Sequence, residues 1–205
     1  KIIPVFKDGD ETDPGNYRPI SLLSIFNRIF EKLMYNRLKH FLEKHNILTE
    51  SQYGFRERRS TEHAILDIVG KIKKNMDNSM FTCGVFIDLK KAFDTVDHDI
   101  LLYKLYHYGI RGVVQDWFRS YLTERIQTTE IGHHISTKEK VLCGVPQGSV
   151  LGPLLFLIYV NDICRASTKL DLFLFADDTN LLYADKKLKT LETIVNTELL
   201  KVYDW

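Results

Sequence analysis

The sequence predicts an α+β fold, in which helices alternate with short antiparallel strands. Apolar residues recur at helical spacing in several stretches of the 205-residue chain. Between them lie apolar runs typical of strands, near residues 81–89 and 170–183. No internal repeat, low-complexity segment or Pro/Gly/Ser-rich linker divides the chain. We therefore expect one or two domains with a substantial core.

The first part of the chain is expected to contain an arm and two helices. Residues 1–20 are rich in turn residues, which predicts an extended arm. Ser21 precedes a helical pattern that runs to Leu38. A charged loop over residues 51–60 then leads to a second helix over residues 61–76, whose first residues suit a helix start.

The central part begins with a predicted strand over residues 81–89, which ends on Asp88. Asp97 can cap the following helix, and Gly109 can stop it. Apolar spacing predicts a further helix over residues 113–122.

The last part combines strands with two helices. Segments near residues 125–131 and 140–144 are strand-like, and an apolar helix is expected over residues 150–163. A hairpin over residues 170–183 places two adjacent aspartates at its turn. The amphipathic pattern from Leu188 onward predicts the final helix.

Composition excludes several classes of protein. Hydrophobic residues make up 44% and charged residues 27%, as in an ordinary globular protein. The net charge of +1 gives no strong field for a polyanion, although the first sixty residues are mildly basic. Three distant cysteines without a C-x-x-C pair argue against a disulfide framework and a zinc site, and fit a reducing compartment. The longest apolar run, residues 150–160, is too short to span a bilayer.

Three carboxylates carry the clearest chemical signal. Asp177 and Asp178 stand side by side in an apolar run, where mutual repulsion and burial both disfavour ionisation. Asp88 ends a second apolar strand. Carboxylate oxygens suit a hard divalent ion such as Mg²⁺, and carboxylates on two strands suit two-metal phosphoryl transfer. A solvated turn between two hydrophobic strands is the alternative explanation for these aspartates.

Five sequence blocks follow one another along the chain. They are Asn16-Tyr17-Arg18-Pro19-Ile20-Ser21-Leu22, Gln52-Tyr53-Gly54-Phe55-Arg56, Phe86-Ile87-Asp88-Leu89-Lys90-Lys91-Ala92-Phe93-Asp94, Gly144-Val145-Pro146-Gln147-Gly148-Ser149-Val150-Leu151-Gly152-Pro153 and Phe175-Ala176-Asp177-Asp178. In this order they resemble the blocks of reverse transcriptases, the first two those of the fingers and the last three those of the palm. The blocks are most similar to polymerases of non-LTR (LINE-type) retrotransposons, jockey- and CR1-like elements in particular. The resemblance covers essentially the whole chain.

The resemblance implies RNA-directed DNA synthesis with two Mg²⁺ ions, for which Mn²⁺ could substitute. It makes Asp88 and Asp177 the principal metal ligands, with Asp178 adjacent and the Leu89 carbonyl as an extra oxygen. The ions would position a dNTP and activate the primer 3′-hydroxyl.

The resemblance also implies four nucleotide-binding residues. Phe93 would lie under the sugar and exclude a 2′-hydroxyl, with a plain core aromatic as the alternative. Gln147 and Gly148 would open the following helix and meet the nucleotide or the template base. Arg56 would approach the triphosphate.

The resemblance gives other roles to two further residues of these blocks. Arg18 would touch the template or primer, with a solvated surface as the alternative for Arg18 and Arg56 alike. Asp94 is expected to cap a helix or bond to the backbone rather than to bind metal.

The implied architecture is the fingers and palm of a right hand, with an antiparallel palm sheet backed by helices. Fingers would comprise residues 1–79 and 97–143, and palm residues 80–96 and 144–205. The chain begins with Lys1 and stops within a helical pattern at Trp205, so it is expected to be a piece of a longer polyprotein, without the thumb and endonuclease. RNA template, DNA primer and dNTP are the expected partners, no membrane is expected, and the location is expected to be nuclear and cytoplasmic.

Two other functions compete with polymerisation. A polymerase-derived nucleic-acid-binding relic would have no need for three costly carboxylates. A different metal-dependent phosphotransferase or nuclease would have no use for a sugar gate at Phe93 or for the Pro146-Gln147-Gly148 block.

Overall fold

Apolar residues in alternation build a three-stranded antiparallel sheet at the centre of one half of the protein. The computed structural model describes all 205 residues and shows two compact units, residues 1–45 with 91–159 and residues 46–90 with 160–205. In the second unit, the sheet has the strand order β3-β9-β8, with β3 Phe81–Asp88, β8 Asp171–Phe175 and β9 Asp178–Asp185. The other elements of this unit are α2 Thr61–Asp77, α6 Leu188–Asp204 and the short 3₁₀ helix η2 Ile163–Arg165.

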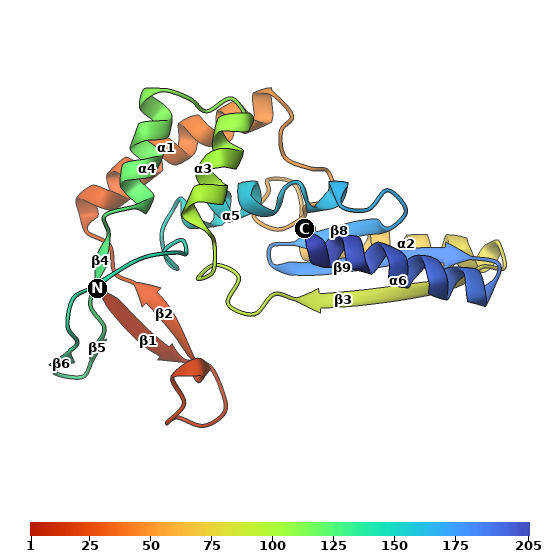
Figure 1. Cartoon of the computed structure of the whole chain (residues 1–205), viewed down its shortest axis with the longest axis horizontal. Helices are drawn as coiled ribbons and strands as arrows, with labels where there is room; N and C mark the ends of the chain where they lie inside the picture. The colour runs from red at the N-terminus through yellow and green to blue at the C-terminus, as the bar shows by residue number, and fades with distance from the viewer. The chain divides into compact units, whose positions relative to one another are not determined.

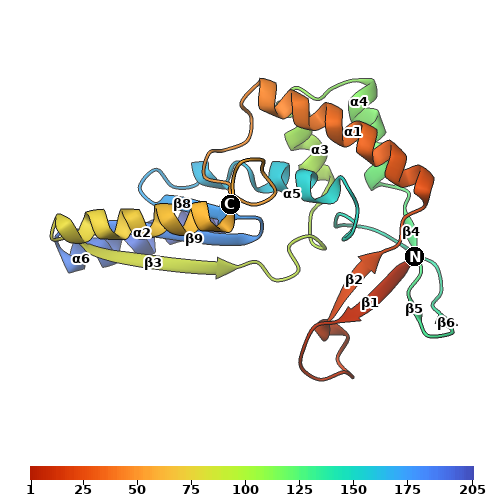
Figure 2. The ribbon, with the colours of Figure 1, turned by 180° about the vertical axis from the view of Figure 1, so that it is seen from behind.

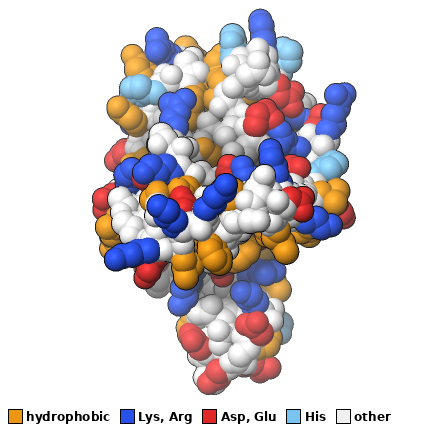
Figure 3. Space-filling view, turned by 90° about the vertical axis from the view of Figure 1, so that its right-hand side faces the viewer, with side chains coloured by type: hydrophobic (Ala, Val, Ile, Leu, Met, Phe, Trp, Pro, Cys, Tyr) orange, Lys and Arg blue, Asp and Glu red, His pale blue; other side chains and the backbone are white.

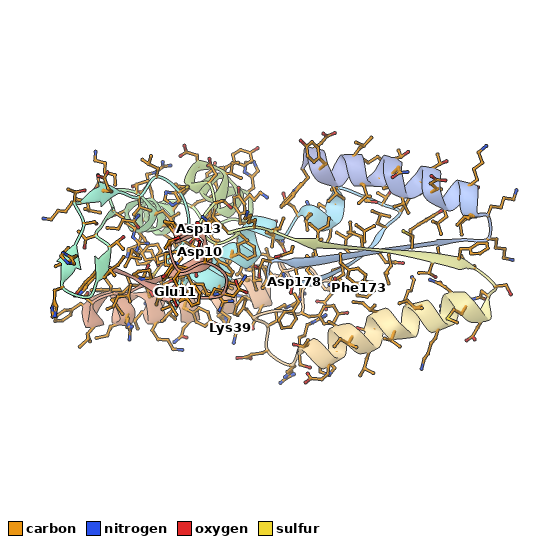
Figure 4. All side chains as sticks on the ribbon, turned by 90° about the horizontal axis from the view of Figure 1, so that it is seen from below. Asp10, Glu11, Asp13, Lys39, Phe173 and Asp178 are labelled. Carbon is orange, nitrogen blue, oxygen red and sulfur yellow. The ribbon has the colours of Figure 1, made fainter.

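Helices cover both faces of this sheet. Figure 4 shows α2 on one side of the three strands and α6 on the other. The α6 face has a core of Leu172, Leu174 and Leu181, against which Leu199 and Val202 of α6 pack. On the α2 face, Lys71 forms an ion pair of 2.8 Å with Asp171 of β8. The sheet is therefore sandwiched between two helices, and its strand ends carry the aspartates.

The first unit consists of small hairpins and four helices (Figures 1 and 2). Its strands are β1 Ile2–Phe6, β2 Tyr17–Ser21, β4 Ile126–Gln127, β5 Glu130–Ile131, β6 His134–Ile135 and β7 Glu139–Lys140, and η1 Pro14–Asn16 is a 3₁₀ turn. Its helices are α1 Ile25–Lys44, α3 His98–His107, α4 Val113–Leu122 and α5 Gly152–Val160. The pairs β1-β2, β4-β7 and β5-β6 are antiparallel.

The buried helix α5 contributes much of the core of this unit. It is apolar around its whole circumference, which is the pattern of a helix that packs on every side. Leu154, Leu155 and Ile158 are all buried. No helix of the protein is both long and apolar enough to cross a membrane.

Capping side chains lie at the starts of three of the six α-helices. Asp97 accepts hydrogen bonds from the backbone of Asp99 and Ile100, so its predicted role as a cap is confirmed. Ser60 caps α2 in the same way. The predicted ranges of α4 and the start of α6 are confirmed, and α2 and β3 differ by one residue at their ends.

Two predicted boundaries are wrong. Ser21 ends β2 and does not precede the helix directly; the cap of α1 is Ser24, whose hydroxyl accepts from Asn27 N. Ser21 extends the strand because its N–H donates to the Gln147 carbonyl and the next N–H donates to Lys1 O. The expected arm over residues 1–20 is consequently a hairpin. The second wrong boundary concerns the apolar helix expected over residues 150–163, which is confined to α5.

Candidate active site

The strand register brings two of the three predicted aspartates face to face. Asp88, the last residue of β3, is the direct cross-strand partner of Asp178, the first residue of β9. Both residues are exposed and lie on the same face of the sheet, because paired residues share a face. Like charges directly opposite each other on neighbouring strands are destabilising. This pair is therefore an electrostatic cost that a bound cation would relieve.

Asp177 lies in the tight turn between β8 and β9 and is half-buried. Ala176 precedes it with φ of 56°, a left-handed conformation that a residue with a Cβ adopts rarely. The turn thus holds Asp177 beside the strand pair in a strained backbone. The sequence places both aspartates at the turn, and the register adds that Asp178, not Asp177, opposes Asp88.

The neighbouring carboxylates affect the ionisation of Asp178. Desolvation raises the pKa of Asp178, and the negative charges of Asp177 and Asp88 raise it further. No group of three or more His, Cys, Asp or Glu side chains forms a ready-made metal cage. Mg²⁺, however, usually binds through one or two carboxylates and completes its shell with water and substrate phosphates. The donor set fits such an ion, and the Leu89 carbonyl follows Asp88 directly.

The segment of residues 52–54 supports the aspartate turn. The Gln52 side-chain Oε1 accepts hydrogen bonds from Ala176 N at 3.0 Å and from Gly54 N at 2.8 Å. Tyr53 N donates to Leu174 O, so this segment runs along β8 as a short parallel bridge. A Cβ on Gly54 would lie 2.4 Å from Ala176 N, a distance that real Cβ atoms do not tolerate. Only glycine fits at this position.

Arg56 follows this segment and is held by its own loop. Its Nη1 donates to the Thr49 carbonyl at 2.6 Å, and its Nη2 lies 3.6 Å from a carboxylate oxygen of Glu50. The side chain is only partly exposed. A role for Arg56 at a triphosphate stays a prediction.

The other predicted residues belong to the first unit, where Phe93 packs as an aromatic pair. Its ring lies 4.5 Å from that of Phe156, with 28° between the planes. Phe156 is a buried core residue of α5, whereas Phe93 is half-buried. The ring is therefore anchored on the core and keeps some surface exposed, so both sequence-based explanations of Phe93 stay open.

Gln147 is positioned by Asp94, which corrects the expectation for Asp94. The Gln147 Nε2 donates to both Asp94 carboxylate oxygens, at 2.9 and 3.0 Å. Asp94 caps no helix, since the next cap is Asp97. Burial raises the pKa of Asp94, while the hydrogen bond from Gln147 and the charge of Lys91 lower it. Asp94 is thus a half-buried acceptor that fixes the orientation of the Gln147 amide.

Gly148 forms a turn with Gln147 and does not open a helix. Its φ of 92° lies in the left-handed region that favours glycine. The following helix α5 begins only at Gly152, so the expected helix start at residues 147 and 148 is wrong. Arg18 is exposed on β2 opposite Val5. Its predicted contact with nucleic acid is not tested by this position.

The sequence and fold are those of a polymerase family. The family model described as reverse transcriptase (RNA-dependent DNA polymerase) matches residues 6–202, and the chain belongs to this family. The structure resembles the telomerase of Candida albicans in complex with a telomeric RNA fragment, with a TM-score of 0.58, 14% identity, and coverage of 89% of this chain and 38% of the telomerase. It also resembles the apo telomerase of Candida tropicalis, with a TM-score of 0.54, 11% identity, and coverage of 95% and 43%. These likenesses show the fold.

Two of the curated relatives come from mobile elements of Drosophila melanogaster. The probable RNA-directed DNA polymerase from transposon BS is 34% identical, over 89% of this chain and 21% of its own length. The RNA-directed DNA polymerase from mobile element jockey is 33% identical, over 91% of this chain and 21% of its length. The resemblance to retrotransposon polymerases of the jockey type is confirmed. The chain spans about a fifth of the length of these relatives.

Sequence reasoning missed the residues that support the site. Gln52 and Gly54 were visible only as parts of a fingers block, and Asp94 only as the end of a palm block. Their contacts join residues 124 and 53 positions apart in sequence, so no local pattern reveals them.

Proposed function

We propose that this domain catalyses RNA-directed DNA synthesis, in which nucleotidyl groups pass from a dNTP to a primer 3′-hydroxyl. The observation that carries this proposal is the exposed like-charged pair Asp88–Asp178, with Asp177 in the adjoining turn. Such a pair is costly unless divalent cations neutralise it. Membership of the reverse transcriptase family supports nucleotidyl transfer as the reaction at this site.

Asp88, Asp177 and Asp178 would hold two Mg²⁺ ions, with Mn²⁺ as a possible substitute and Leu89 O as an additional ligand. Bound divalent ions would supply charge neutralisation at the phosphates and a more acidic 3′-hydroxyl. The protein's own part is to keep the carboxylates adjacent, which the β3–β9 register and the Gln52 bond to the turn support.

The nucleotide-binding residues expected from the sequence are part of the same proposal. Phe93, anchored on Phe156, is proposed to lie beneath the sugar and to exclude a 2′-hydroxyl. The Gln147 amide, oriented by Asp94, and the Gly148 backbone are proposed to contact the nucleotide. Arg56 is proposed to approach the triphosphate, and Arg18 the template or primer.

The finer architecture is part of the same proposal. Residues 1–79 and 97–143 would act as fingers, and residues 80–96 and 144–205 as palm. The two compact units divide the chain elsewhere, at residues 45, 90 and 159. A thumb and an endonuclease in a larger polyprotein, together with nuclear and cytoplasmic location, stay predictions.

Primer extension tests the proposal. The 205-residue chain and a longer protein that contains it are each incubated with poly(rA)/oligo(dT), dTTP and Mg²⁺. We expect the primer to lengthen with the longer protein, and lengthening to stop when EDTA is added. A shortened primer would indicate a nuclease, and primer–template binding without extension by either protein would indicate a binding relic; both results would overturn the proposal.

A further inference from the structure

A pocket in the first unit lies between α1 and α4. Its volume is about 280 Å³, and its walls are Leu23, Asn27, Phe30 and Glu31 from α1 and the segment before it, and Trp117, Ser120, Tyr121 and Arg125 from α4 and the segment after it. Figures 1 and 2 both show α4 beside α1. Half of these side chains are polar, so the pocket is not simply an uncovered apolar groove.

Aromatic rings and a guanidinium form a continuous stack along one wall. The Trp117 and Tyr121 rings are nearly parallel, with 6° between their planes and 5.4 Å between centroids. The Arg125 guanidinium carbon lies 5.5 Å from the Tyr121 centroid. Tyr121 is thus flanked by both neighbours. Trp117 is half-buried and ends the parallel stack, and the Phe118 ring meets it nearly perpendicularly, with 87° between the planes and 5.1 Å between centroids. A flat ligand can extend this stack on Trp117.

Three polar groups around the stack are available for hydrogen bonds to a ligand. The Arg125 guanidinium, the Trp117 indole N–H and the Asn27 side-chain amide make no hydrogen bond or ion pair within the protein. Glu31 is only 1% exposed, and its two oxygens accept from Tyr121 OH and Val150 N, each at 2.7 Å. The carboxylate is therefore already satisfied, and the open groups are a cation, an indole donor and an amide.

We infer that this pocket binds one base of single-stranded template RNA, with the base stacked on Trp117 and a neighbouring phosphate at Arg125. Aromatic rings with an arginine are the recurrent means of holding single strands without sequence preference. The volume lies near the lower end of small-ligand pockets, roughly 300–1,000 Å³, which suits one nucleotide better than a protein helix. The choice of RNA rests on the proposed function.

The pocket is also connected to the loop that carries Gln147. Glu31 bonds at once to Tyr121 in the pocket wall and to Val150, three residues after Gln147. A base held in the pocket would therefore stabilise the same rigid network that supports the proposed nucleotide-binding turn. This places the template subsite and the nucleotide loop within one unit.

Tryptophan fluorescence tests the inference directly. The chain has two tryptophans, so the Trp205→Phe variant leaves Trp117 as the single reporter. We expect short oligoadenylate RNA to quench this fluorescence in EDTA without dNTP, and an abasic oligomer of equal length and charge to leave it unchanged. Because no metal or dNTP is present, a failure of polymerisation cannot affect the result.

Matched variants separate stacking from general electrostatics. Trp117→Ala should lower RNA affinity about fivefold or more, since one stacked base contributes about 1–3 kcal/mol. Tyr106→Ala is the control, because Tyr106 pairs with Arg111 at 4.7 Å in the same unit outside the pocket, and it should have no comparable effect. Trp117→Phe, which keeps a ring, should retain most of the affinity, and circular dichroism checks each fold.

Three outcomes would overturn the inference. They are quenching by the abasic oligomer equal to that by RNA, equal loss of affinity in folded Trp117→Ala and Tyr106→Ala, or unchanged fluorescence at saturating RNA. The last result would mean that the pocket receives a protein segment or nothing.

Discussion

The opposition of Asp88 and Asp178 is the residue-scale feature on which the account depends. Without a cation, the pair should weaken the fold, because two carboxylates face each other across β3 and β9. Asp178→Asn should therefore raise stability in EDTA by about 0.2–1 kcal/mol. Asp185→Asn, at the other end of β9, is the control and should change stability little. Urea melts of the three proteins measure the effect, and a less stable Asp178→Asn would contradict it.

The Phe93→Val variant distinguishes a role of Phe93 in sugar selection from a role in core packing. If its ring lies under the sugar, Phe93→Val should reduce discrimination between dTTP and UTP by about tenfold or more, since each 1.4 kcal/mol corresponds to a factor of ten. If the ring serves only to pack on Phe156, the variant should instead lose stability and depress incorporation of both nucleotides together. Single-nucleotide incorporation with a melting curve distinguishes the two. An unchanged ratio in a folded variant would remove Phe93 from the site.

The buried Tyr53 makes the stability of the fold depend on pH in the alkaline range. Desolvation and the hydrogen bond of 2.6 Å to Asp67 raise the pKa of Tyr53 to about 12, from 10.0. The folded state therefore holds the phenol proton more tightly, and this stabilisation is complete below about pH 10 and is lost as pH rises towards 12. Tyr53→Phe should be about 1.5–3 kcal/mol less stable at pH 8. Its stability should also fall less between pH 10 and 12; equal slopes in denaturant melts would contradict the assignment.

At the scale of elements, the aspartate turn depends on the close approach of the Gly54 segment. Gly54→Ala would press a Cβ against Ala176 N, so we expect loss of stability and at least a tenfold loss of primer extension. Gly70→Ala is the matched control, because nothing lies within 4 Å of its Cβ in α2. The control should gain about 0.5–1 kcal/mol of stability from helix propensity. Full activity in Gly54→Ala would show that the segment does not support the turn.

Elements with a strong local signal could be predicted from the sequence, and those fixed by distant contacts could not. The range of α4 and the start of α6 follow from apolar spacing alone. The start of α1 could not be predicted, because a hydrogen bond from Ser21 N–H to the distant Gln147 carbonyl extends β2 to Ser21. The aspartates were visible as adjacent carboxylates in apolar strands. Their register and their support by Gln52 required the folded chain.

At the scale of the whole molecule, charge is balanced and distributed. The net charge is +1, and Figure 3 shows basic and acidic side chains interspersed on the face it presents. Affinity of the 205-residue chain for primer–template should therefore be weak, because few phosphates are neutralised, and it should fall as salt rises, because that electrostatic contribution is screened. Filter binding from low to physiological salt measures this. Nanomolar affinity at physiological salt would contradict the prediction.

The most direct test of the account compares single carboxylate variants in RNA-templated primer extension. Asp88→Asn, Asp177→Asn and Asp178→Asn are prepared in the longer protein that contains this chain, with Asp185→Asn as a folded control from the same strand. Asparagine keeps the shape of each side chain and removes the charge that a divalent ion requires. The account predicts that the control extends the primer at close to the wild-type rate and that Asp88→Asn and Asp177→Asn abolish extension while remaining folded. If folded Asp177→Asn retains more than a few per cent of the wild-type rate, the metal assignment is wrong.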